Sequence, residues 1–96
     1  MIYADKISFN KGDQHRLNTS VRIHLHSESG ELSDGWYYKE TINQWLHEDK
    51  YEIKVEINPF PKLIPVDDGS NRYVRSDQDG TTKDNLLKLE AYTEPE

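Results

Sequence analysis

The stretch that decides the fold is residues 20–57, SVRIHLHSESGELSDGWYYKETINQWLHEDKYEIKVEI, because its hydrophobic period changes twice. Over 20–26 apolar and polar residues alternate strictly, which is typical of a half-buried β-strand. Further along the chain, apolar residues recur at the spacing of one helical face, at Tyr38, Ile42, Trp45 and Leu46. Alternation then returns from Tyr51 to Ile57. This stretch predicts a strand, an amphipathic helix and a second strand.

The ends of the expected helix carry different signals. Asp34 is a candidate N-cap, because a short acidic side chain can accept from the first free backbone amides. Trp36 just before the helix favours a hydrophobic staple that ties the helix start to the sheet, although with Tyr37 and Tyr38 it could instead form an exposed aromatic patch. Glu48-Asp49 are unfavourably placed for the helix dipole, so we expect the helix to end there without a strong cap.

The flanking segments complete one domain over residues 1–92. Residues 2–9 have a mixed pattern that suggests a strand. Apolar segments 63–66 and 72–76 flank a loop with glycine, which predicts a β-hairpin, and 85–89 is expected to be a short strand or extended segment. We expect residues 93–96 to be a disordered tail. The predicted fold is α+β, an antiparallel sheet of about four to six strands with one helix packed on it.

Composition excludes several classes of function. The 96 residues include no cysteine, so a disulfide framework, a thiolate metal site and a cysteine nucleophile are all excluded. The net charge of −6 argues against binding to a phosphate backbone. The longest apolar runs are too short for a membrane span, and the start of the chain lacks the pattern of a signal peptide. We expect a cytoplasmic protein that binds neither nucleic acid nor membrane.

His24 and His26 are candidate metal ligands. They lie two residues apart on one strand, so both imidazoles project from one face, and such a pair can share a zinc or nickel ion. A complete site needs a third and a fourth ligand, which the spacing of the two histidines does not supply. The simpler interpretation is that both histidines belong to an exposed polar strand face. The sequence therefore predicts no cofactor and leaves a metal site as an alternative.

A second candidate, Asp77-Gln78-Asp79-Gly80, resembles the middle of a calcium-binding loop. The positions of the first ligand and of the bidentate glutamate are occupied by Arg75 and Leu86, so a turn is the better interpretation. No nucleophile elbow, phosphate loop or zinc-protease motif occurs, and these absences argue against an enzyme without excluding one.

Tyr73 and Arg75 form the candidate binding surface. If Val74 faces the core, both side chains point outward, and tyrosine and arginine are enriched in interface hot spots. The competing and favoured interpretation is that Arg75 pairs with Asp77, Asp79 or Asp84 and holds the following loop. Trp36 is the third candidate binding residue.

The C-terminal third carries a specific pairing of Tyr73-Val74-Arg75-Ser76 with Asp84-Asn85-Leu86-Leu87. In this pairing, and in the Trp36-led helix followed by an alternating strand, the chain resembles a family of short bacterial and phage proteins labelled domain of unknown function 3892. Leu89 is followed by Glu90, where that family usually has proline. The resemblance implies a bacterial or mobile-element origin and no known activity. We expect Leu86, Leu87 and Leu89 to dock this segment on the core.

Taken together, these features predict a small non-catalytic binding or regulatory module that acts through protein contacts. Two alternatives stay open. One is a metal-binding protein or metal-assisted enzyme that uses His24 and His26. The other is an acidic inhibitor of a nucleic-acid-binding protein, which requires a contiguous negative face. Self-association through a sheet edge would give a homodimer.

Overall fold

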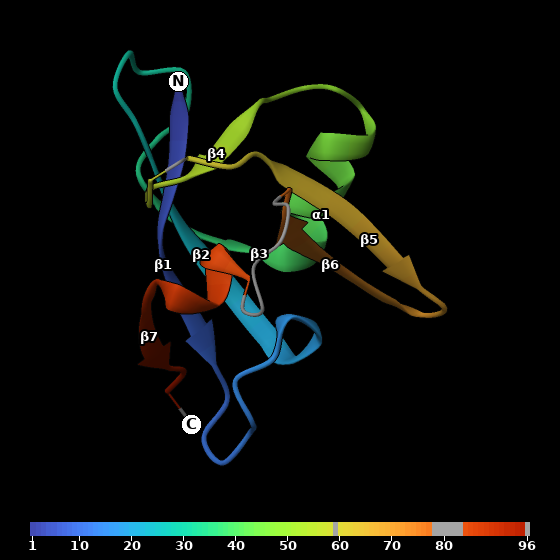
Figure 1. Ribbon diagram of the computed structural model, residues 1–96. Helices are drawn as coiled ribbons and strands as arrows, with labels where there is room; N and C mark the ends of the chain where they lie inside the picture. Colours follow the sequence, from blue (N-terminus) through green and yellow to red (C-terminus); the bar gives the residue numbers. More distant parts are fainter. Residues whose placement is uncertain (59, 78–83, 96) are drawn as a thin grey trace.

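The computed structural model describes residues 1–58, 60–77 and 84–95. Its main layer is a sheet of five strands (Figure 1). In chain order these strands are β1 (Ile2–Phe9), β2 (Ser20–Ser27), β3 (Gly35–Tyr38), β4 (Ile53–Val55) and β7 (Glu90–Thr93). The order across the sheet is β3-β2-β1-β4, and β7 also pairs with β1.

Strand β1 lies at the centre and has a different partner along each half of one edge. Along this edge, residues 2–4 pair in parallel with β4 and residues 6–9 pair in parallel with β7. Along the other edge, β1 pairs antiparallel with β2. The sheet is therefore mixed, whereas the sequence predicted antiparallel pairing. The reason is the helix between β3 and β4. It returns the chain to the end of the sheet at which β3 began, so β4 runs in the same direction as β3.

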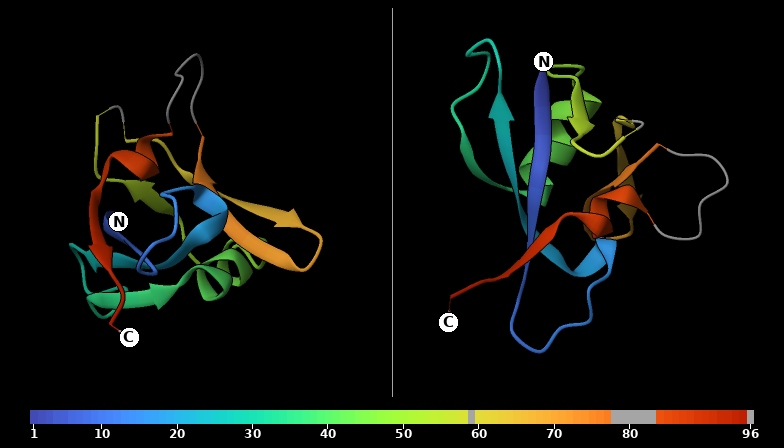
Figure 2. Two further views of the ribbon diagram at one scale, coloured as in Figure 1. Left: turned by 90° about the horizontal axis from the view of Figure 1, so that it is seen from below. Right: turned by 60° about the vertical axis from the view of Figure 1, so that its left-hand side comes forward.

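One face of this sheet is covered by the remaining elements. They are the helix α1 (Lys39–His47), the hairpin of β5 (Leu63–Asp68) and β6 (Asn71–Ser76), and the 3₁₀ helices η1 (Leu17–Thr19) and η2 (Asn85–Lys88). Helix α1 contacts both strands of the hairpin, which projects from the sheet beside it (Figure 1). Figure 2 shows the sheet edge-on, with the helix and hairpin on the same side. In the described ranges, no helix has the length and apolar character needed to span a bilayer.

The core lies between the two layers. Its buried apolar members come from both sheets, from α1 and from the segment around η2, and they are Ile2, Ala4, Ile7, Phe9, Ile23, Leu25, Ile42, Ile53, Val55, Leu63, Val74, Leu86 and Leu89. The α+β class with a single helix is thus confirmed, as is the burial of Val74. Leu86 and Leu89 are buried and Leu87 packs against them, as expected for a segment that docks on the core.

The start of the helix differs from the expectation. Residues 35–38 form β3 rather than a helix entrance, because their backbone pairs with β2. Tyr38 stands at the N-cap position, and the Asp34 carboxylate accepts from the Ser27 amide instead. Tyr37 contacts Trp45 of α1 with the ring centroids 5.2 Å apart, so Tyr37 and not Trp36 ties this strand to the helix.

The C-terminal segment also differs. Residues 85–88 form a 3₁₀ helix instead of a strand, because the Asp84 carboxylate caps it by accepting from the Leu86 amide. Thr93 ends β7, and the Glu94 side chain forms an ion pair with Arg22, so the expectation of a disordered tail is wrong for these two residues. The two termini lie at opposite ends of the sheet (Figure 1).

Candidate functional site

The face of the five-stranded sheet opposite the core, which we call the outer face, carries the side chains that alternate with buried residues. Contacts between neighbouring strands link most of them. The side chains of this face are Tyr3, Asp5 and Lys6 from β1, Arg22, His24 and His26 from β2, Trp36 and Tyr38 from β3, Lys54 and Glu56 from β4 and its end, and Tyr92 from β7.

A β-bulge positions Asp5 on this face. Ala4 pairs with Leu25 and Lys6 with His24, so Asp5 is an extra residue in β1. The extra residue lets Ala4 and Ile7, three positions apart, both face the core while the two polar residues between them face outward. The offset between the apolar pairs 2/4 and 7/9 is the sequence signal of this bulge.

Beside the bulge, two histidines and two carboxylates form what we call the histidine–carboxylate cluster. His24 Nδ1 lies 2.7 Å from Asp5 Oδ1, and His26 Nε2 lies 2.6 Å from Glu56 Oε2. One potential ligand atom each from Asp5, His26 and Glu56 lies within 4.8 Å of the other two. The sequence indicated that His24 and His26 lie on one strand face. It did not indicate that Asp5 and Glu56 lie beside them, because this depends on how β1 pairs with β2 and with β4.

The electrostatics of the cluster favour a charged imidazole at His26. The hydrogen bond with the Glu56 carboxylate raises the pKa of His26 above its ordinary value, and burial opposes this only in part. The His26 ring also lies against Tyr3 with centroids 5.6 Å apart, and the rings of Phe60 and Tyr3 make an edge contact at 6.2 Å. These two rings form an apolar wall beside the cluster.

An aromatic group lies along the other part of the outer face. The Trp36 ring makes edge contacts with His24 at 5.3 Å and with Tyr92 at 5.5 Å. Trp36 is half-buried and belongs to β3, so it neither staples the helix nor lies fully exposed as a patch. Lys6 Nζ lies 5.8 Å from the centroid of the Tyr92 ring, which extends the group to β1.

Charges on the outer face are interleaved rather than segregated. Glu94 binds Arg22 through two contacts of 2.6 and 3.1 Å, Asp5 and Glu56 are bonded to histidines, and Glu90 accepts from the Tyr92 hydroxyl at 3.0 Å. The pKa of the Glu94 carboxyl is lowered because Arg22 donates to it. The outer face is therefore not the contiguous negative surface that an inhibitor of nucleic-acid-binding proteins requires.

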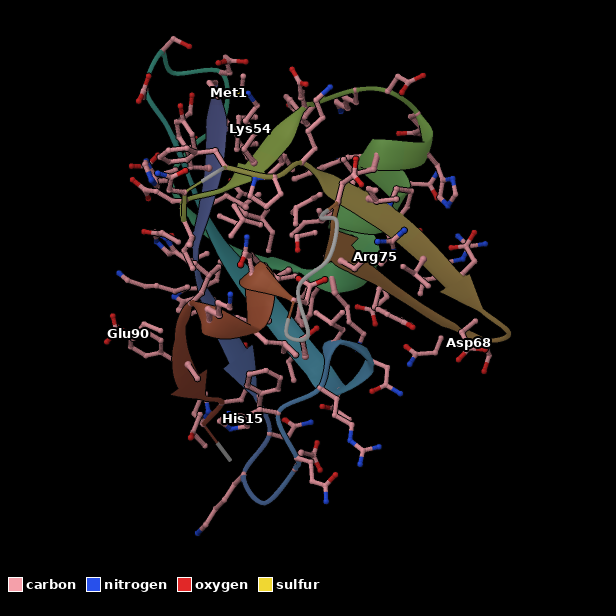
Figure 3. The ribbon with its side chains drawn as sticks, in the orientation of Figure 1. Met1, His15, Lys54, Asp68, Arg75 and Glu90 are labelled. Carbon is pink, nitrogen blue, oxygen red and sulfur yellow. The ribbon has the colours of Figure 1, made fainter. Side chains whose placement is uncertain are left out.

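The predicted surface of Tyr73 and Arg75 is only partly formed. Arg75 is exposed and donates to the Ser76 carbonyl oxygen at 3.3 Å, but Tyr73 is half-buried. The Asp84 carboxylate accepts from the Ser76 amide and hydroxyl, so its described bonds go to Ser76 and to η2 rather than to Arg75. Figure 3 shows Arg75 over the hairpin, away from Glu90 at the start of β7. Gln78, Asp79 and Gly80 of the calcium-like segment lie outside the described residues.

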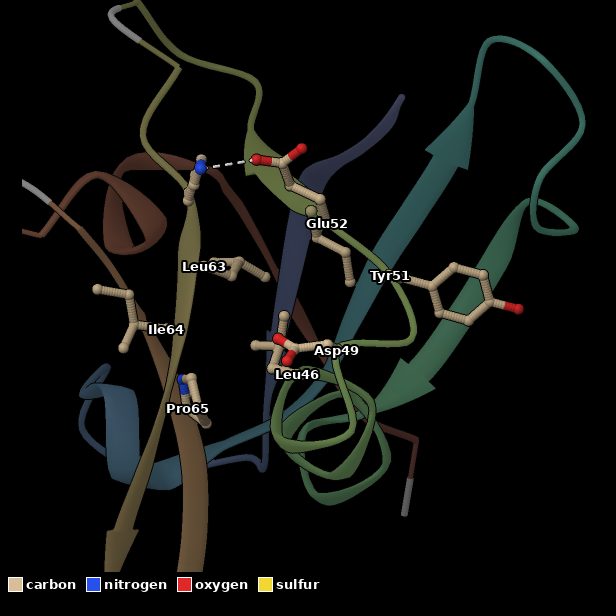
Figure 4. A pocket seen from close by; sticks show the side chains of 9 residues that line it. Leu46, Asp49, Tyr51, Glu52, Leu63, Ile64 and Pro65 are labelled. Atoms are coloured by element: carbon tan, nitrogen blue, oxygen red, sulfur yellow. Dashed lines mark ion pairs between the residues drawn. The ribbon is translucent and has the colours of Figure 1, made fainter.

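A separate pocket lies between the end of α1, the start of β4 and strand β5 (Figure 4). Its volume is about 360 Å³, and Leu46, Ile53 and Leu63 supply apolar wall. Lys62 Nζ and Glu52 bridge its rim at 2.8 Å, and both side chains are at least half exposed. These two charges satisfy each other, and the Asp49 carboxylate also lines the pocket, so its surface is divided between polar and apolar groups.

Comparisons with protein-family models, with curated proteins and with solved structures each find no match to this chain. The resemblance noted from the sequence stays a prediction. Function is therefore argued from the geometry of the outer face.

Proposed function

We propose that this protein is a small non-catalytic binding module that engages a partner protein through its outer face. The proposal rests on the position of the exposed large apolar side chains. Three large hydrophobic residues in the described ranges are exposed by more than a third, Tyr38 at 56%, Phe60 at 44% and Tyr92 at 39%. Tyr38 and Tyr92 lie on the outer face, and Phe60 borders it through Tyr3.

The chemistry of this surface suits a protein partner. Tyrosine and tryptophan supply large contact area with little loss of conformational entropy, and they are enriched at interface hot spots. Three acids of the face, Asp5, Glu56 and Glu94, are hydrogen-bonded to His24, His26 and Arg22, so burying them costs less than burying isolated charges. The net charge of −6 disfavours a nucleic-acid partner. A partner that presents apolar side chains with few charges fits this face best.

The outer face replaces Tyr73 and Arg75 as the leading surface in this proposal. Tyr73 is half-buried, and its carbonyl oxygen accepts from the side chain of Asn43. Arg75 is one of two exposed arginines on the hairpin, with Arg72, whereas the outer face offers several aromatic rings in contact with one another.

The test begins with affinity purification of the tagged protein from its native host and mass spectrometry of the retained proteins. The double variant Tyr38→Ser/Tyr92→Ser should lose a stoichiometric partner, while the matched surface variant Arg75→Ala should retain it. Tyr38 makes no side-chain capping bond, so its substitution spares α1. A partner retained by the double variant but lost by Arg75→Ala would assign the interface to the hairpin and contradict the proposal.

A further inference from the structure

We propose that Asp5, His26 and Glu56 form a binding site for one divalent transition-metal ion, for which zinc has the best-matched donor set. This proposal is independent of the partner protein proposed above. It rests on the histidine–carboxylate cluster, in which neighbouring strands bring together ligands that the sequence separates by up to 51 positions.

The geometry of the three donors is close to what a zinc ion needs. Donors about 2.0–2.2 Å from a tetrahedral ion lie roughly 3.5 Å from one another. The present separations of up to 4.8 Å therefore require a closure of roughly 1 Å, and the hydrogen bond of 2.6 Å between His26 Nε2 and Glu56 Oε2 must open by a similar amount to admit the ion. The Glu56 side chain is 43% exposed and follows the end of β4, so it can make this adjustment, whereas His26 and Asp5 are held on paired strands.

Neighbouring side chains support two of the three donors, Asp5 and His26. His24 Nδ1 lies 2.7 Å from Asp5 Oδ1, which orients that carboxylate and leaves its second oxygen available. Metal-binding side chains are commonly oriented in this way by a hydrogen-bonded neighbour. The rings of Tyr3 and Phe60 form an apolar wall on one side, and the exposed side at Glu56 leaves a fourth coordination position open.

The donor set also selects the class of metal. Two carboxylates balance the charge of a divalent ion, and one imidazole nitrogen favours zinc and other late first-row ions over magnesium and calcium, which prefer oxygen alone. The chain contains no cysteine, so a thiolate site cannot compete for the ion.

A matched control is present on the hairpin side of the molecule. His47 Nε2 lies 2.9 Å from Asp67 Oδ2, which reproduces one histidine–carboxylate pair. Among the described residues, no third ligand atom completes a metal-binding group there. If zinc merely associated with exposed histidine–carboxylate pairs, it would bind equally well at both places. A specific three-ligand site would instead bind zinc only at the histidine–carboxylate cluster.

The test is isothermal titration calorimetry with zinc chloride at pH 8, where protons compete least with the metal. We expect one ion per chain for the wild type and for His47→Ala. Affinity should fall more than about 100-fold in His26→Ala and Glu56→Gln, and about 10–100-fold in His24→Ala, which loses only the orienting bond. Magnesium and calcium should bind more weakly than zinc.

Two further readouts keep the test decisive. Cobalt(II) should give a visible absorption band with the wild type and not with Glu56→Gln, and zinc should shift the ring nitrogen resonances of His26 in the folded protein. Glu56 is exposed, so Glu56→Gln is expected to fold even if His26→Ala does not. No zinc binding to the wild type, or equal binding by the Glu56→Gln and His47→Ala variants, would overturn the proposal.

Discussion

Asn43 is the residue that joins the helix to the hairpin. It is fully buried, and its Nδ2 donates to the carbonyl oxygens of Tyr73 at 2.9 Å and Val66 at 3.2 Å. Its Oδ1 has no partner in the described part of the chain. Because a buried carbonyl that loses its donor is costly, we expect Asn43→Ala to lower the free energy of unfolding by about 1–3 kcal/mol.

Urea unfolding of Asn43→Ala and Asn43→Asp measures this link. The aspartate should be the more damaging, because a carboxylate cannot donate to the oxygens that surround it. Gln44→Ala, on the exposed side of the same helix, serves as the control and should change stability by less than about 0.5 kcal/mol. Equal stability of Asn43→Ala and the wild type would show that the amide contributes nothing to helix docking.

Asp49 lies two residues after the end of α1, in a backbone conformation that favours glycine. The Lys50 amide donates to the Trp45 carbonyl and the Asp49 amide to the Leu46 carbonyl, which is a Schellman motif, so the expectation of an uncapped end is wrong. Asp49 has φ of 52° and places a negative charge at the helix C-terminus. We expect Asp49→Gly to raise the free energy of unfolding by up to about 1 kcal/mol.

Asp49→Ala separates the two causes of this effect. It removes the charge but keeps the side chain at positive φ, so it should gain less than Asp49→Gly in the same urea titration. An alanine variant at least as stable as the glycine variant would mean that backbone strain at this position is negligible.

At the scale of elements, the bond between Glu94 and Arg22 joins the chain just after β7 to β2, in addition to the pairing of β7 with β1. The pKa of Glu94 is lowered by Arg22 below the ordinary 4.5, so the pair stabilises the folded state above that pH. As the pH falls from 4.5 through the folded-state pKa, this contribution is lost. We expect the stability difference between wild type and Glu94→Gln to be constant from about pH 6 to 8 and to shrink toward pH 3.

Urea titrations across this pH range measure the effect, with Arg22→Ala as the partner variant. Both substitutions remove the same ion pair. The free energy of unfolding should therefore lose the same part of its pH dependence in Arg22→Ala as in Glu94→Gln. A difference between wild type and Glu94→Gln that persists undiminished at pH 3 would show that the pair does not stabilise β7.

At the scale of the whole molecule, one core joins the five-stranded sheet to the helix and hairpin. Trp36 lies on the outer face, and Trp45 lies in α1 against Tyr37 and Tyr51. The variants Trp36→Phe and Trp45→Phe each leave one tryptophan as a reporter of one layer. We expect the urea transition followed by fluorescence to coincide with that followed by circular dichroism in both variants.

Separate transitions would instead show that the helix and hairpin open before the sheet. The comparison is made within each variant, so a change in overall stability caused by either substitution does not affect it. Coincidence of the two signals is therefore a direct measure of whether Val74 and Leu63 couple the hairpin to the main core.

Local periodicity accounts for the parts of the fold that were predictable. Strict alternation identified β2 and the faces of its side chains, and the helical period identified α1 through Ile42, Trp45 and Leu46. Strands β3 and β7 were missed because each has four residues, too few to establish a period. Their strand conformation depends on pairing with β2 and β1.

The candidate site shows the same division. The sequence by itself determined an α+β domain with one helix and a hairpin, and it placed His24 and His26 on one strand face, because these features follow from neighbours along the chain. Only the tertiary structure decided that Asp5 and Glu56 meet these histidines, since that contact depends on the parallel pairing of β4 with β1 and on the bulge at Asp5. Strand order and register result from the packing of the whole core, which no local pattern encodes.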